Sequence, residues 1–101
     1  MNLEFEDFEF SRKIVDQTIK IDDDKIEAHI QGTLLSFIGD MDTSSYDVKV
    51  KVIYFLRHIS ALFLNYCVNP EVYLVSEKEI EKSFKSRKII LNIIKSYREQ
   101  L

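Results

Sequence analysis

The sequence predicts an α+β fold in a single domain spanning residues 1–101, with an antiparallel β-sheet of about four to five strands and a long C-terminal α-helix packed on it. Two patterns favour this class. Apolar and polar residues alternate along residues 47–54, which is the period of a strand. From residue 76 onward, apolar residues recur near every 3.6 positions, which is the period of a helix. With 46% hydrophobic residues, a chain of this length is expected to fold around one core.

The first half of the chain is expected to contribute extended segments. Residues 3–10 alternate apolar side chains with acids, and one change of phase indicates a β-bulge or a bend. Residues 14–21 continue as a second extended segment, and residues 25–38 alternate again. The acidic run 22–24 and the polar run 39–45 contain residues that favour turns, so we expect them to connect these segments.

The middle of the chain contains the clearest strand pattern and an ambiguous one. Valines at alternate positions predict a strand over residues 47–54. Residues 59–68 are apolar on both faces, which is typical of a central strand covered on both sides. A buried helix fits the composition of residues 53–68 equally well, because length alone does not separate the two. Residues 71–75 are expected to form a short strand after the turn at Pro70.

The last quarter of the chain has the signature of a helix. Ser76 and Glu79 have the spacing of a capping box, in which the hydroxyl accepts from one backbone amide and the carboxylate from the other. Acids at the start and bases near the end suit the helix dipole. The apolar stripe then comprises Ile80, Phe84, Ile90, Ile93, Ile94, Tyr97 and Leu101.

The residue types that carry chemistry do not form a known motif. With two glycines, the chain cannot build a glycine-rich phosphate loop. His29 and His58 lie on separate predicted strands without a second ligand at metal-binding spacing, and Cys67 lies in an apolar stretch typical of a core residue. The acidic run 22–24 lacks the glycine and the length of an EF-hand loop. We therefore expect no catalytic residue, no metal, no cofactor and no enzymatic activity.

Charge and hydropathy exclude further classes of partner. The formal net charge of −3 argues against binding nucleic acid, which requires cations against phosphates. No apolar run approaches the length of a membrane span. The acidic first residues are wrong for a secretory signal, so we expect a cytoplasmic protein without a membrane partner.

Charge is unevenly divided between the two halves of the chain. Residues 1–50 contain 12 acids and 5 bases, a net charge of −7, whereas residues 51–101 contain 5 acids and 9 bases, a net charge of +4. Such asymmetry is typical of an acidic face that binds a basic partner. Alternatively, the acids occupy turns and solvent-facing positions, and the basic helix covers its own sheet.

The chain has more apolar residues than one thin sheet can cover, which indicates protein binding. Either the helix covers them, or another subunit or an unfolded chain does, so we expect a homo-oligomer or a polypeptide partner. The candidate protein-binding residues are aromatic and aliphatic residues of the predicted strands: Phe5, Phe8, Phe10, Tyr54, Leu62, Leu64 and Tyr66.

In its second half the chain resembles the SecB family of export chaperones. The alternating strand at 47–52, the more apolar strand at 61–68 and the short segment 71–75 are similar to successive parts of that family. The polar stretch 76–84 and the helix at 89–99 follow in the same order. The resemblance implies an antiparallel sheet backed by a helix, association through sheet edges and helices, and apolar grooves for non-native polypeptide.

Two functions follow from these observations. The first is a SecB-like chaperone or adaptor that binds polypeptide through apolar sheet and helix surfaces. The alternative is a small acidic inhibitor or immunity protein, of the kind encoded by phages or mobile elements, that blocks one specific protein target through charge complementarity.

Overall fold

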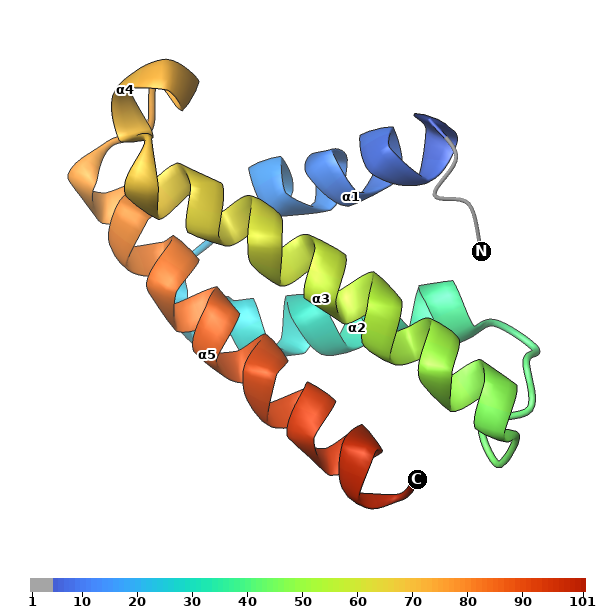
Figure 1. Cartoon of the computed structure of the whole chain (residues 1–101). Coiled ribbons are helices and arrows are strands. Elements are labelled where there is room, and N and C mark those ends of the chain that lie inside the picture. Colours follow the sequence, from blue (N-terminus) through green and yellow to red (C-terminus); the bar gives the residue numbers. More distant parts are fainter. Residues whose placement is uncertain (1–4) are drawn as a thin grey trace.

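Every regular element in the described part of the chain is a helix. The computed structural model describes the backbone of residues 5–101 and the side chains from Glu9 onward. In chain order the elements are α1 (Phe5–Thr18), the 3₁₀ turn η1 (Asp23–Lys25), α2 (Ile26–Ile38), α3 (Tyr46–Val68), α4 (Pro70–Tyr73) and α5 (Glu77–Glu99) (Figure 1). Within residues 5–101 there is no strand, so the prediction of an α+β fold with an antiparallel sheet is wrong.

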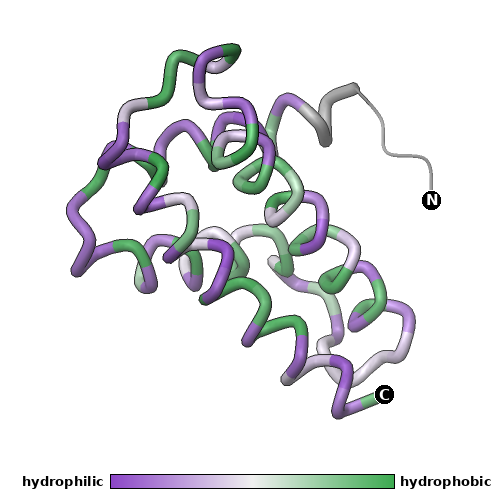
Figure 2. Tube along the Cα trace, turned by 60° about the vertical axis from the view of Figure 1, so that its left-hand side comes forward, coloured by the Kyte–Doolittle hydropathy of each residue, from purple (hydrophilic) through white to green (hydrophobic). Residues whose placement is uncertain are grey.

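Helix α3 is the centre of the arrangement. Helix α5 runs antiparallel beside it, joined through the short α4, while α1 lies along the opposite flank of α3 and α2 crosses behind (Figure 1). Side chains from all four long helices meet in one core. Apolar and hydrophilic residues alternate along each helix (Figure 2), because each helix buries one side only. The core comprises Ile14, Val15, Ile19, Ile26, Ile30, Leu34, Ile38, Val52, Ile53, Phe55, Leu56, Ile59, Leu62, Phe63, Tyr66, Ile90 and Ile94.

The seam between α3 and α5 is lined by small side chains. The thiol of Cys67 lies 3.9 Å from the carbonyl oxygen of Ile80, which sets the register of the two helices. Ser60 of α3 and Ser86 of α5 are both buried. Ser83 is buried as well, so the two backbones can approach closely along the seam.

The predicted strand over 47–54 and the predicted central strand over 59–68 both belong to α3. The segment that looked apolar on both faces is a helix with one buried side, because Leu62, Phe63 and Tyr66 are buried whereas Leu64 and Val68 are exposed. The alternative of a buried helix is therefore the correct one. A run of 23 residues without Gly or Pro can satisfy all of its backbone hydrogen bonds locally, which overrides the β-propensity of its valines.

The other predicted strands are helical too. Residues 3–10 and 14–21 are predicted to be extended, but residues 5–10 and 14–18 lie in α1, and residues 19–21 form the turn that follows it. Residues 25–38 form α2, and the short strand expected at 71–75 is replaced by α4. The C-terminal helix is confirmed, with its capping box. Glu79 N–H donates to the Ser76 hydroxyl at 3.2 Å, and Ser76 N–H donates to the Glu79 carboxylate at 2.9 Å.

Candidate protein-binding surface

The corner between α3 and α5 is a tight, well-defined turn, which we call the elbow and define as residues 69–75. Asn69 ends α3, and Pro70 begins α4, since proline has no N–H to lose at the first position of a helix. Helix α4 then ends at Leu74, whose backbone is left-handed, and Val75 N–H donates to the carbonyl of Pro70 at 2.9 Å. The elbow therefore projects from the helical body as a closed turn (Figure 1).

Leu74 is the least expected residue of the elbow. Its φ of 55° and ψ of 45° lie in the left-handed region, where a residue with a Cβ is strained by about 1 kcal/mol and glycine is normal. Its side chain is 90% exposed, so packing does not offset that strain. Glycine would fold better at this position, and the leucine must therefore be explained by something other than folding.

Two valines extend the exposed apolar surface around Leu74. Val72 is 73% exposed on α4, and Val68 is 64% exposed at the end of α3. We call Val68, Val72 and Leu74 the elbow patch. Isolated apolar residues on a surface are ordinary, but here three exposed aliphatic side chains occur within seven positions, at the end of α3 and on the turn that follows it.

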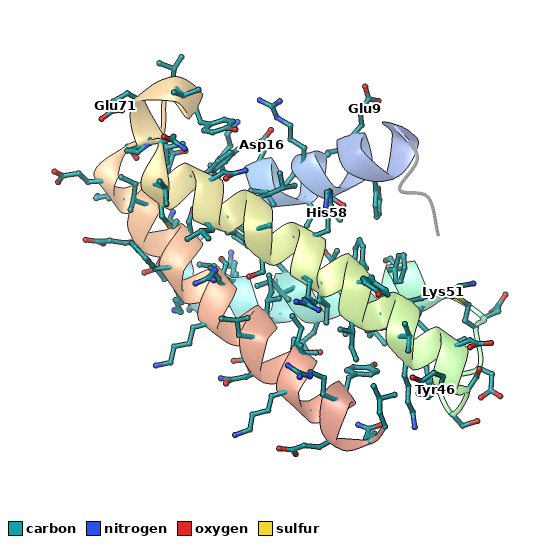
Figure 3. All side chains as sticks on the ribbon, viewed as in Figure 1. Glu9, Asp16, Tyr46, Lys51, His58 and Glu71 are labelled. Carbon is teal, nitrogen blue, oxygen red and sulfur yellow. The ribbon has the colours of Figure 1, made fainter. Side chains whose placement is uncertain are left out.

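The opposite side of the elbow is anchored to α1 by polar and aromatic contacts. The buried hydroxyl of Tyr66 donates a hydrogen bond to the Asp16 carboxylate. The Tyr73 ring packs against the Tyr66 ring with centroids 4.9 Å apart, and the Arg12 guanidinium lies 5.9 Å from the centroid of the Tyr73 ring. In Figure 3, Asp16 lies on α1 beside the end of α3, whereas Glu71 points outward from the elbow. The elbow is thus held in place from inside and open outside.

The electrostatics of the anchor favour a neutral tyrosine. Burial, and then the hydrogen bond to Asp16 and its negative charge, raise the pKa of Tyr66 to about 12. Burial also raises the pKa of the Cys67 thiol, which disfavours the reactive thiolate. Neither group has the depressed pKa of an activated nucleophile.

The polar rim of the elbow patch carries more negative than positive charge. Glu71 on α4 and Glu77 at the start of α5 are both exposed, and Lys78 follows them. Glu77 lies in the first turn of α5, where the helix dipole favours a negative charge. The surface is therefore aliphatic at its centre and mildly acidic at its edge.

The residues proposed from the sequence are scattered in the structure. Leu62 and Tyr66 lie in the core, where a partner cannot touch them in this conformation. Tyr54 and Leu64 are exposed on α3. Phe10 is part-exposed on α1, with its ring centroid 6.2 Å from that of the core residue Phe55. The side chains of Phe5 and Phe8 lie outside the described residues. The structure does not bring the five described residues of this set together into one surface.

Sequence reasoning missed the elbow patch itself. Once 46–68 is drawn as a helix, Val68 falls on the outer side with Leu64, so a helical wheel would have found it. Leu74 had one available signal, a non-glycine residue shortly after a proline-initiated turn. The hydrogen bond between Tyr66 and Asp16 had no signal in the sequence, because the two residues are 50 positions apart.

The other surfaces and cavities are weaker candidates for a binding site than the elbow patch. Between α2 and α5 lies an open groove of about 410 Å³ lined by Leu35, Ile93 and Tyr97, among others. Inside the core, the space between Phe63 and Ile90 measures about 10 Å³, which is too small for a ligand. From Glu9 onward, no group of three or more His, Cys, Asp or Glu side chains is placed to hold a metal ion. Of the described helices, none is both long and apolar enough to cross a membrane.

Comparison with known proteins adds no relative. No model of a known protein family matches the chain, and neither the curated proteins nor the solved structures contain a match. The resemblance to the export chaperones thus gains no support, and the sheet that it implied is absent from residues 5–101.

Proposed function

We propose that the protein is a small binding module that inhibits or otherwise controls one specific protein partner through the elbow patch. The observation that carries the proposal is Leu74, an exposed leucine kept at a left-handed position where glycine would fold better. Large aliphatic groups presented on a rigid turn lose little entropy on binding, which is the property of an interface anchor.

The charge of the chain supports a partner with a basic rim around an apolar pocket. The net charge is −3, and Glu71 and Glu77 border the elbow patch. Complementary charge speeds association and discriminates between partners, whereas the buried aliphatic groups supply most of the affinity. We place the encounter in the cytoplasm and assign the chain no chemistry of its own.

The chaperone hypothesis has lost its physical basis. It depended on a strand over residues 59–68 with two apolar faces, and that segment is a helix with its apolar side in the core. A small rigid patch suits one shaped pocket better than many unfolded chains, so the single-target alternative replaces the chaperone hypothesis.

The test first identifies the protein that contacts position 74 and then measures whether Leu74 contributes to the affinity for that protein. A photo-reactive residue placed at position 74 should cross-link one partner in cells, and the same residue at the exposed position 35 on α2 should not. In a binding assay with that purified partner, Leu74→Gly should weaken affinity by roughly ten-fold or more, the usual effect of truncating an interface anchor.

The matched control is Leu35→Ala, which also removes an exposed leucine. It should leave the affinity for that partner unchanged. Equal affinity of Leu74→Gly and the parent protein would contradict the proposal. Cross-linking of many unrelated unfolded proteins at position 74 would contradict it as well, because it would restore the chaperone class.

A further inference from the structure

A second surface, on α5, has the spacing of a helix that faces another helix. Phe84, Lys88, Leu91, Lys95 and Arg98 follow one another at intervals of four, three, four and three residues, which places all five along one side of α5. All five are exposed, Phe84 by 56% and Leu91 by 43%. We call them the basic stripe. Its apolar members have no covering element within the described chain.

The cations of the basic stripe form no ion pair with any side chain described from Glu9 onward. From Phe84 to Arg98 the sequence contains five Lys or Arg residues and no acid. Among the side chains from Glu9 onward, the one ion pair joins Lys25 to Asp22, far from this helix in the sequence. Leu91, Lys95 and Arg98 also border an open depression of about 390 Å³, which Ile94 and the acid Glu99 line as well and which leaves room beside the stripe for another segment.

The chain itself contains a segment of the complementary chemistry. Between residues 3 and 10, four acids alternate with aliphatic and aromatic residues, and this segment leads into α1. Glu9, the first of these acids whose side chain is described, is exposed and points away from the body of the molecule (Figure 3). Opposite charges on two segments that both contain apolar residues favour pairing between them.

The two complementary segments cannot pair within one copy. Helix α1 packs on one flank of α3 and α5 on the other, so α3 lies between them (Figure 1). A contact between the acidic segment and the basic stripe must therefore join two molecules. Each molecule carries both the acidic segment and the basic stripe. Two copies can therefore form two equivalent contacts, which use both surfaces of both molecules.

We propose that two copies of the chain form a reciprocal dimer, in which the acidic segment 4–9 of each copy lies along the basic stripe of the other. The contact buries Phe84 and Leu91 and pairs Lys88 and Lys95 with carboxylates. Because the pairs lie at the edge of the contact, added salt weakens it. The basic stripe is separate from the elbow patch. The proposed dimer therefore does not depend on the proposed function, and each is tested by its own experiment.

Charge reversal on both sides provides the experiment. One variant of the full chain carries Lys88→Glu and Lys95→Glu, and a second carries Glu6→Lys and Glu9→Lys. Sedimentation equilibrium should give the parent protein twice the 12.0 kDa monomer mass at low salt, and a lower mass at about 0.5 M salt. Each variant alone should be monomeric, with dimer affinity reduced at least about ten-fold.

Mixing the two variants should restore a dimer. The new glutamates at positions 88 and 95 of the first variant then face the new lysines at positions 6 and 9 of the second. The unchanged basic stripe of the second variant faces the unchanged acidic segment of the first. The matched control is Lys51→Glu with Lys78→Glu, which makes the same change of charge at exposed positions outside the stripe and should leave the dimer intact. Circular dichroism checks that every variant is folded. A monomeric parent protein, or a dimer that both reversals leave intact, would overturn the proposal, as would a mixture that stays monomeric.

Discussion

At the scale of single residues, one hydroxyl connects the first helix to the third. Tyr66 donates to Asp16 from a buried position, and its ring supports Tyr73 on the elbow. Loss of this hydrogen bond would leave a part-buried carboxylate without its donor, which costs more than the hydrogen bond itself contributes. The residues that hold the elbow are therefore different from those that it exposes.

The alkaline stability of the protein should report on this contact. The folded protein raises the pKa of Tyr66 from its ordinary value near 10 to about 12, so the folded state keeps a proton that the unfolded state releases. The stabilisation is complete below pH 10 and is lost as pH rises toward 12. Urea unfolding at a series of pH values should show this decline in the parent protein.

Tyr66→Phe should lose about 2 kcal/mol at neutral pH and show a weaker decline above pH 10. Tyr97→Phe provides the control, since Tyr97 packs at the edge of the core and takes no part in the contact between Tyr66 and Asp16. If Tyr66→Phe has the same free energy of unfolding as the parent protein at neutral pH, the hydrogen bond between Tyr66 and Asp16 does not stabilise the fold.

At the scale of elements, the seam between α3 and α5 depends on small side chains. Ser83 and Ser86 are fully buried, and their hydroxyls donate to the carbonyls of Glu79 and Lys82 at 2.9 and 2.7 Å, within their own helix. The hydroxyls are thus satisfied without α3, and what the seam requires is small volume.

Two substitutions at one position separate volume from hydrogen bonding. Ser86→Ala keeps the side chain small and should change the free energy of unfolding by less than about 1 kcal/mol. Ser86→Leu adds volume at a fully buried position and should cost about 3 kcal/mol. Thermal or urea unfolding measures both. Equal stability of the two variants would show that the helices do not pack closely at Ser86.

The elements also show why the sequence predicted strands where helices form. The buried residues of α2 are Ile26, Ile30, Leu34 and Ile38, each four positions after the last. Four is close to one helical turn, but it is also an even number, so these residues share a face in a strand as well. The pattern of α5 includes intervals of three, which only a helix brings to one side, and that helix was predicted correctly with its capping box.

The candidate surface was less predictable than the fold. Whether Leu64 or Leu62 is exposed depends on the helical period, so the error in secondary structure passed directly into the choice of binding residues. Leu74 becomes conspicuous only when its backbone angles and its exposure are known together. Contacts such as that of Asp16 with Tyr66 depend on how the helices pack, which local patterns do not encode.

At the scale of the whole molecule, the residues that form the core are different from the residues that we propose for binding. The core of α1, α2, α3 and α5 is built from residues other than the elbow patch, and the basic stripe lies outside it as well. A protein of about 100 residues has only some 5–15 kcal/mol of stability, so exposed apolar groups that do not support the fold need a separate explanation. We propose binding to another protein as that explanation.

The most direct test of this division is the free energy of unfolding of the triple variant Val68→Thr, Val72→Thr and Leu74→Gly, measured by urea titration. We expect it to lie within about 1 kcal/mol of the parent value, because three exposed groups are changed and one strained backbone position is relieved. A loss of more than about 3 kcal/mol would contradict the account, because it would make the elbow patch part of the structural core.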